Sequence, residues 1–206
     1  MSTIGIIDYG MGNIASVQNA LSFIGVESVI IDTPSLLNTA DKLILPGVGA
    51  FPMAMQNLRD RHFIEELSRI VAGEGKPLMG LCLGMQLLFE TGHEFGQHKG
   101  LGWISGNVLA LEPEKIKLPV PHMGWNELTI LNDSPILASI PEQERDVYFV
   151  HSYFCRAENR SDVVATVDYG VEMDVLIQKG NIYGCQFHPE KSQKTGLRIL
   201  QNFCEL

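Results

Sequence analysis

The sequence lacks the marks of a membrane, secreted or nucleic-acid-binding protein. No apolar run approaches the roughly 20 residues that a membrane span needs. The start MSTIGIIDYG has neither the basic segment nor the cleavage site of a signal peptide. Basic residues number 15 against 24 acidic ones, a net charge of -9, whereas a nucleic-acid surface needs a basic stripe. We therefore expect no membrane partner and no nucleic-acid partner.

Cysteine is scarce as well. The four cysteines are Cys82, Cys155, Cys185 and Cys204. They form no C-x-x-C pair and no metal-ligand cluster, so in the absence of an export signal we expect reduced thiols in a cytoplasmic protein. Three of them lie in apolar runs and are expected to be small buried side chains. Only Cys82 has neighbours of a different kind.

In the first half of the chain, short apolar runs alternate with helical patterns. Strands are predicted at residues 4–8, 28–31, 42–46 and 77–81. Helices are predicted after Asn13, which can cap one of them, and at residues 63–71 and 83–89. This alternation implies right-handed crossovers and a parallel sheet that helices cover on both faces.

The second half has short, partly alternating runs joined by turn residues. Strands are predicted at residues 107–111, 127–131, 147–150, 163–168, 175–178 and 182–187. A last helix opens at Ser192 and presents Leu197, Leu200, Phe203 and Cys204 to the core. We predict one α/β domain over residues 1–206, with a central, mostly parallel sheet flanked by helices and with antiparallel strands in its second half.

The segment Gly80-Leu81-Cys82-Leu83-Gly84 lies between a predicted strand and a predicted helix. G-x-C-x-G in this place is a nucleophile elbow with sulfur instead of oxygen. The sharp turn strains the backbone of the central residue, so its neighbours must lack clashing side chains. The start of a helix also favours a thiolate. We interpret Cys82 as a nucleophile, although a buried cysteine in a glycine-flanked turn is the alternative.

The segment Gln186-Phe187-His188-Pro189-Glu190 ends the last predicted strand. Residues i and i+2 of an extended chain point the same way, and Pro189 restricts the backbone between them. Glu190 can therefore bind one imidazole nitrogen of His188 while the other faces a cleft, as in the base and orienter of a catalytic triad. A lone histidine after a strand is more often structural, but a cysteine elbow in the same chain favours catalysis.

Glycines surround Val48 in the segment Pro46-Gly47-Val48-Gly49-Ala50-Phe51, which follows a predicted strand. They leave the backbone free to turn its N–H groups toward a cleft. The N–H of Leu83 and the loop at Val48 and Gly49 are therefore candidate oxyanion donors. A plain loop would also use glycines, so this signal depends on the elbow nearby.

The other histidines are expected to be surface or hydrogen-bonding residues. They are His62, His93, His98, His122 and His151. His93 and His98 are a conceivable metal pair, but neither a carboxylate nor a cysteine completes a site around them. We expect no metal and no cofactor.

These motifs together resemble the class I, or triad, glutamine amidotransferases. Within that family the sequence looks most like the glutaminase subunits of imidazole glycerol phosphate synthase, from histidine biosynthesis. The matching stretches are DYGMGN (8–13), PGVGAF (46–51), GLCLGMQLLFE (80–90), PHMGWN (121–126), FVHSY (149–153) and QFHPEKS (186–192). They are spread over nearly the whole chain, and PHMGWN is the most diagnostic of them.

The resemblance implies binding roles for further residues. Gln86 should contact the bound glutamine, Glu94 should hold its amino group, and the backbone of Ser152 and Tyr153 should meet its carboxylate. The side chains expected at a partner interface are Asn13, His122, Trp125 and Lys191. The structural alternatives are a helix cap for Asn13, a core position for Trp125 and a solvated charge for Lys191.

The family also implies a reaction and a partner. Cys82 would attack the glutamine side-chain amide and His188 would move the protons, so that glutamate and ammonia form. A (β/α)₈ barrel cyclase would use the ammonia in a heterodimer, making imidazole glycerol phosphate and an aminoimidazole carboxamide ribonucleotide.

Three alternatives stay open. A paralogous glutaminase could feed another acceptor, such as a sugar in surface-polysaccharide synthesis. A thiol hydrolase of the α/β-hydrolase type shares the elbow, although its acid normally precedes the histidine at a distance, whereas Glu190 directly follows His188. A catalytically dead regulatory subunit would have no need of the intact set of Cys82, His188 and Glu190.

Overall fold

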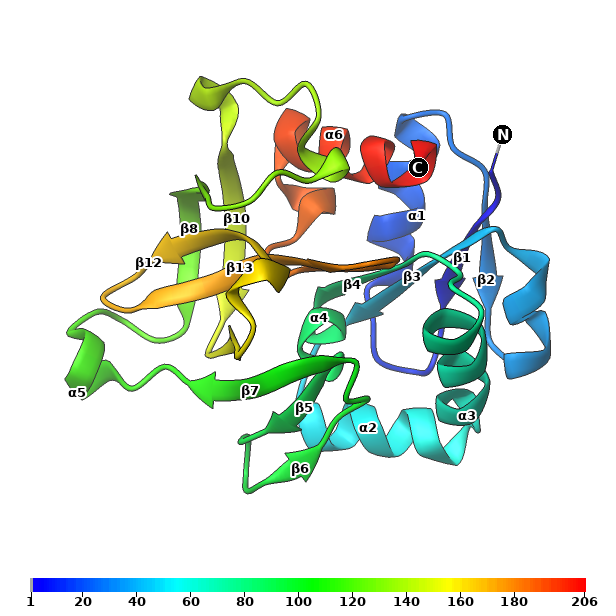
Figure 1. Ribbon diagram of the computed structural model, residues 1–206, viewed down its shortest axis with the longest axis horizontal. Coiled ribbons are helices and arrows are strands. Elements are labelled where there is room, and N and C mark those ends of the chain that lie inside the picture. The colour runs from blue at the N-terminus through cyan, green and yellow to red at the C-terminus, as the bar shows by residue number, and fades with distance from the viewer. Residues whose placement is uncertain (1) are drawn as a thin grey trace.

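The computed structural model describes residues 2–206. Five neighbouring strands of its main sheet are parallel (Figure 1): β2 (Ser28–Ile31), β1 (Ile4–Ile7), β3 (Lys42–Gly47), β4 (Leu78–Cys82) and β14 (Ile182–Cys185). All but the outermost, β2, are buried along their whole length. That is why they read as continuous apolar runs and could be predicted from the sequence.

Beyond β14 the sheet becomes mainly antiparallel, as predicted. It continues through β13 (Glu172–Lys179), β11 (Tyr153–Ala157), β7 (Ile104–Ala110), β5 (Phe89–Gly92) and β6 (His98–Lys99). On its other side β13 pairs with β12 (Val163–Asp168), which pairs with β9 (Thr129–Ile130). Only β5 and β7 run parallel here. A separate antiparallel pair is formed by β8 (His122–Glu127) and β10 (Asp146–His151).

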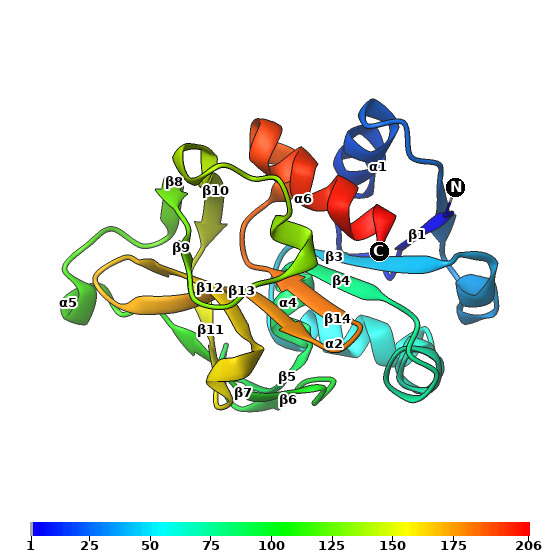
Figure 2. The ribbon, with the colours of Figure 1, turned by 45° about the horizontal axis from the view of Figure 1, so that its top comes forward.

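Helices cover the two faces of the parallel half, each over its own hydrophobic core. On one face lie α1 (Ile14–Phe23) and α6 (Gln193–Glu205), and on the other lie α2 (Phe51–Asp60), α3 (Phe63–Leu67) and α4 (Leu83–Leu87), as Figures 1 and 2 show. A π-helical turn (Ser68–Gly73) extends α3, and a short helix α5 (Pro113–Ile116) follows β7. The predicted fold class is confirmed.

The helix predicted at residues 83–89 ends early. It stops at Leu87, and Phe89 begins β5. The carbonyls of Leu87 and Leu88 accept hydrogen bonds from the N–H groups of Leu101 (2.8 Å) and Trp103 (2.9 Å), which lie far along the chain. Such long-range backbone bonds replace helix continuation, and an apolar run alone cannot distinguish the two outcomes.

The strand predicted at residues 127–131 is wrong in its bounds. Residues 122–127 form β8, and the following strand β9 covers only Thr129–Ile130. Pro121 and Gly124 suggest turns, yet Gly124 fits the strand with φ 144°. The strands β5, β6 and β11 were not predicted, because pairing partners distant in sequence decide them.

Close packing of the elbow onto β3 explains its glycines. A Cβ atom on Gly84 would lie 1.8 Å from the carbonyl oxygen of Leu45, and one on Gly47 would lie 2.8 Å from the backbone nitrogen of Gly84. The first turn of α4 therefore rests directly on the end of β3, with no room for a side chain at either contact.

Gly84→Ala should lower the free energy of unfolding by about 3 kcal/mol or more, because rigid backbone would have to move. Gly73→Ala is the control, since its nearest neighbour would be 3.8 Å away, and it should change stability by less than about 1 kcal/mol. Urea unfolding of both variants measures this. Equal stability of the two variants would contradict the packing argument.

Candidate active site

Cys82 lies at the junction of β4 and α4 in a backbone conformation that side chains rarely adopt, with φ 53° and ψ -110°. Such strain persists only where the surrounding structure imposes it, and it is common at functional sites. Here the imposing structure is the contact between α4 and β3. The residue is buried except for its edge on a cleft, so the turn holds its sulfur at the cleft wall.

His188 and Glu190 form the pair that the sequence predicted, but by a different backbone path. His188 Nδ1 and Glu190 Oε1 are 2.8 Å apart, with side chains 6% and 2% exposed. The intervening chain is a 3₁₀ turn, Pro189–Lys191, and not an extended segment. The turn leads into α6, so its last residues coil while Glu190 folds back on the imidazole.

A second strand fixes this turn. The His188 N–H donates to the Tyr148 carbonyl on β10 at 3.0 Å. The Ser192 hydroxyl donates to the His188 carbonyl at 2.7 Å and accepts from the Tyr148 N–H at 2.9 Å. Ser192 occupies the N-cap position of α6 as predicted, but its side chain makes no cap hydrogen bond. It ties the catalytic turn to β10 instead.

The pKa of His188 is raised to about 9. Burial of the imidazole lowers its pKa, but hydrogen bonds to Cys82 and Glu190 outweigh that effect, and the negative charges of both partners add to it. The imidazole is therefore a cation near neutral pH, ready to give a proton to a leaving group.

One cleft of about 480 Å³ collects most of the predicted site. Its walls come from the glycine loop after β3, the elbow, the loop after β5, the end of β10 and the His188 turn. Its lining residues are Val48, Gly49, Cys82, Leu83, Gln86, Glu94, Phe95, Val150, His151, Ser152, Tyr153, His188 and Lys191. Gly49 has φ 100°, a conformation that suits glycine and lets the loop turn at the cleft mouth.

Two of the predicted substrate-binding side chains also make contacts within the chain. The Gln86 amide nitrogen donates to the Tyr153 carbonyl and to the Gln186 side-chain oxygen, each at 3.0 Å. A Glu94 carboxylate oxygen accepts from the N–H of Phe51 at 2.7 Å, at the start of α2. These contacts leave the single amide oxygen of Gln86 and the second carboxylate oxygen of Glu94 unused, and both residues line the cleft.

The residues predicted at a partner interface differ in exposure. Asn13 caps α1 by accepting from the Ser16 N–H at 3.3 Å, and Lys191 is exposed at the cleft. Trp125 is 45% exposed and lies edge-on to Tyr148, so it is not a core residue.

His122 lies on the inner face of β8. Its side chain is 1% exposed and stacks on the rings of Phe149 and Tyr169. Its two ring nitrogens contact His151 Nε2 at 2.9 Å and Asn126 Oδ1 at 2.8 Å. The even positions of β8 point inward, and the sequence did not show that residues 122–127 form a strand. The side chain is thus buried within the chain, and a contact of His122 with a partner stays a prediction.

The sequence analysis assigned no role to Gln186 and did not predict that His151 lies in the cleft. Gln186 is fully buried, and its amide nitrogen lies 3.8 Å from the Cys82 sulfur. His151 Nδ1 lies 2.9 Å from the Tyr153 carbonyl oxygen. A glutamine inside an apolar strand, two residues before His188, was the available signal, because buried glutamines need partners.

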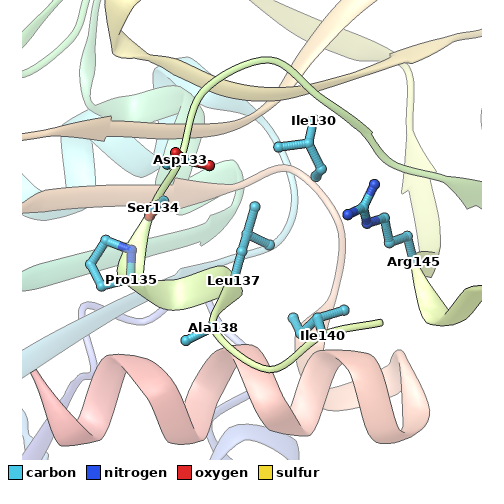
Figure 3. A pocket seen from close by; sticks show the side chains of 8 residues that line it. All are labelled: Ile130, Asp133, Ser134, Pro135, Leu137, Ala138, Ile140 and Arg145. Atoms are coloured by element: carbon cyan, nitrogen blue, oxygen red, sulfur yellow. The ribbon is translucent and has the colours of Figure 1, made fainter. Parts of the chain in front are cut away.

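A second hollow, of about 440 Å³, is lined by residues of the segment that runs from β9 to Arg145 (Figure 3). Its lining residues are Ile130, Asp133, Ser134, Pro135, Leu137, Ala138, Ile140 and Arg145. Asp133 and Arg145 enter it from opposite sides, and its lining in the described chain includes no cysteine and no histidine. Because Cys82 and His188 line the cleft of about 480 Å³, that cleft is the candidate active site.

Residues 2–206 contain neither a metal-binding cluster nor a membrane-spanning helix. No group of three or more histidine, cysteine or acidic side chains there could hold a metal ion. No helix in that range is long and apolar enough to cross a membrane.

Comparison with known proteins gives the class that this fold and site define. The family "Glutamine amidotransferase class-I" matches residues 5–206, and the chain belongs to that family. Its fold is shared by a crystal structure of a glutamine amidotransferase, with TM-score 0.74, 20% identity and coverage of 98% of this chain and 97% of that one. The structure of PurLQS from Thermotoga maritima gives TM-score 0.78 at 20% identity, with coverage of 100% and 99%.

Curated relatives identify the branch of the family. The imidazole glycerol phosphate synthase subunit HisH of Sulfurimonas denitrificans is 48% identical, over 97% of this chain and 96% of the relative. The subunit HisH of Streptococcus sanguinis is 50% identical, over 97% and 94%. The subunit HisH 1 of Campylobacter jejuni is 46% identical, over 98% and 100%. The chain is therefore a member of the HisH family.

The stability of the fold should depend on pH through His188. Its folded-state pKa of about 9 exceeds the ordinary value of 6.5, so its stabilising contribution is present below pH 6.5 and is lost as the pH rises through 9. The stability difference between wild type and His188→Asn should therefore shrink by about 3 kcal/mol from about pH 6 to about pH 9.5.

Urea unfolding at the two pH values measures this difference. His62→Asn is the matched control, because His62 is exposed and its left-handed backbone, with φ 59°, tolerates asparagine. Its difference from wild type should be the same at both pH values. A constant difference for His188→Asn as well would show that the buried ion pair is absent.

Proposed function

We propose that this chain is the glutaminase subunit of an imidazole glycerol phosphate synthase and acts in histidine biosynthesis. It hydrolyses glutamine to glutamate and ammonia, and a cyclase subunit uses the ammonia to form imidazole glycerol phosphate and an aminoimidazole carboxamide ribonucleotide. One observation carries the proposal: a strained cysteine and a histidine that is paired with a buried glutamate line one cleft, in a chain that is 48% and 50% identical to two HisH subunits over 97% of its length.

The reaction proceeds by nucleophilic catalysis. The Cys82 sulfur attacks the side-chain amide carbon of glutamine, and the carbonyl π electrons move to oxygen. The Leu83 N–H and the loop at Val48 and Gly49 stabilise this oxyanion. His188 gives its proton to the nitrogen as the C–N bond breaks and ammonia leaves. His188 then takes a proton from water, which attacks the thioester and releases glutamate. Glu190 orients the imidazole and stabilises its cationic form.

The cleft offers groups that suit the rest of the substrate. Glu94 would offer negative charge to the α-ammonium group, and the backbone of Ser152 and Tyr153 would bind the α-carboxylate. The free oxygen of Gln86 can accept a hydrogen bond from glutamine. These assignments follow the family resemblance, and the presence of all four residues at one cleft supports them.

The partner in this proposal is a (β/α)₈ barrel cyclase that binds over the cleft as a heterodimer. Large apolar side chains are exposed around this opening, namely Val48 and Phe95 in the cleft wall and Met123 and Trp125 on β8. Met123 pairs in register with Val150, which lines the cleft. Exposed apolar patches of this kind are typical of protein-binding surfaces. Asn13 and Lys191 would add polar contacts at the rim.

The working compartment in this proposal is the cytoplasm. All four cysteines within the described residues are free thiols, and all are buried. Burial raises the pKa of the Cys155 and Cys185 thiols, and it raises the pKa of Cys204 to about 12. Unreactive buried thiols of this kind suit a reducing compartment.

Cys82→Ala should abolish glutamine-dependent synthesis by the complex and leave ammonium-dependent synthesis near the wild-type rate. The acceptor chemistry needs only ammonia, which can enter from solvent. Steady-state product formation with glutamine or with an ammonium salt measures both. Cys204→Ala, which removes a thiol in α6, should retain both activities. Loss of the ammonium-dependent rate in a well-folded Cys82→Ala complex would contradict the division of labour.

Trp125→Ala should weaken the complex by about 2 kcal/mol, because aromatic side chains near the centre of an interface contribute strongly. The melting temperature of the isolated chain should stay nearly unchanged, since the indole is half-exposed. Titration calorimetry and thermal unfolding measure these effects. Phe23→Ala, at the far end of α1 and 79% exposed, should affect neither. A drop of several degrees for Trp125→Ala would make it a core residue.

A further inference from the structure

Gln186 lies next to the nucleophile Cys82, and the mechanism described above gives it no role. It follows the last residue of β14, and its side chain is fully buried. Its amide nitrogen is 3.8 Å from the Cys82 sulfur, within the range of a hydrogen bond to sulfur. Its amide oxygen is 3.0 Å from the Gln86 nitrogen. The Gln186 side chain therefore forms hydrogen bonds both to Gln86 on α4 and to the Cys82 sulfur.

The orientation of this amide is determined by its neighbours. The carbonyl oxygen of Tyr153 can only accept hydrogen bonds. It lies 3.0 Å from the Gln86 amide and 2.9 Å from His151 Nδ1. The nitrogen end of Gln86 must therefore face Tyr153, because two oxygens would repel each other there.

The orientation of the Gln86 amide also determines that of the Gln186 amide. The nitrogen of Gln86 also faces the Gln186 amide, and it has hydrogen atoms for both contacts. The Gln186 oxygen must accept the second of these hydrogen bonds. The nitrogen of Gln186 is consequently turned toward Cys82. A backbone carbonyl on β11 thus fixes an N–H donor on the sulfur through two buried amides.

We propose that Gln186 is a catalytic residue that stabilises the Cys82 thiolate by donating an N–H to its sulfur. This deepens the proposed function and rests on Cys82 being the nucleophile. A donor to the charged form of a thiol favours that form. The N–H acts twice in a turnover: on the thiolate before it attacks, and on the thiolate that leaves when water cleaves the thioester. In between, the sulfur carries no charge and the contact weakens.

The test measures the pH dependence of Cys82 alkylation by iodoacetamide, because only the thiolate reacts. Gln186→Met keeps the length of the side chain and removes the donor. It should raise the apparent pKa of Cys82 by about one unit, which lowers the alkylation rate at neutral pH about tenfold. Gln186→Glu places a carboxylate oxygen against the sulfur and should raise the pKa further.

Other ionisable groups interact electrostatically with the sulfur, pair with such a group or line the same cleft, and none of them is changed in these variants. They are His188 and Glu190 from the turn after β14, Tyr9 after β1, Cys155 on β11, and His151, Glu94 and Lys191 at the cleft. Gln178→Met is the matched control, because Gln178 is a partly buried, hydrogen-bonded glutamine on the adjacent strand β13. Its alkylation profile should match wild type. Cys82→Ala in each background confirms that Cys82 is the thiol measured.

Alkylation requires neither glutamine nor a cyclase, so its outcome is separate from that of the synthesis assays. If Gln186→Met proves unstable by thermal unfolding, Gln86→Met replaces it. That variant frees the Gln186 amide to turn over, and it should raise the Cys82 pKa by a smaller amount. An unchanged alkylation profile in folded Gln186→Met, or in folded Gln86→Met where that is the variant tested, would overturn the proposal and leave Gln186 a packing residue.

Discussion

The contact between the first turn of α4 and the end of β3 sets the position of the nucleophile, and the rest of the site is arranged around it. A single added carbon at Gly84 would fall within 1.8 Å of the Leu45 carbonyl oxygen, so the two backbones are as close as they can be. This contact holds Cys82 at φ 53° and brings the glycine loop after β3 beside it. The nucleophile and the candidate oxyanion loop are therefore two ends of one rigid junction.

The polar side chains of the site are buried inside an apolar protein, and each depends on a particular partner. The His188 side chain pairs with Glu190, and the His188 backbone N–H donates to a carbonyl of β10. The Gln186 side chain pairs with Gln86, which also donates to a carbonyl of β11. A buried polar group without its partner is costly, whereas a complete network is rigid and specific. This explains why two separate strands must be in place before the cleft is formed.

The features that could be predicted from the sequence are those that depend on residues close together in the chain. Continuous apolar runs gave the parallel strands, and the spacing of Gly80, Cys82 and Gly84 gave the elbow, since both depend on neighbouring residues alone. The environment of Gln186 and the burial of His122 could not be predicted, because their neighbours are distant in sequence. Gln186 bonds to Gln86 on α4, and His122 contacts His151 on β10 and the ring of Tyr169. The His188–Glu190 contact was anticipated, but the turn that makes it was not.

The small sheet of β8 and β10 has a structural consequence. The Tyr148 peptide of β10 is hydrogen-bonded to the His188 turn, and the C-terminal end of β10 leads into Ser152 and Tyr153, which also line the cleft. Its only sheet neighbour among the described residues is β8, which carries Met123 and Trp125 on its outer surface. The strand β8 is thus connected through β10 both to the His188 turn and to the Ser152 and Tyr153 segment of the cleft.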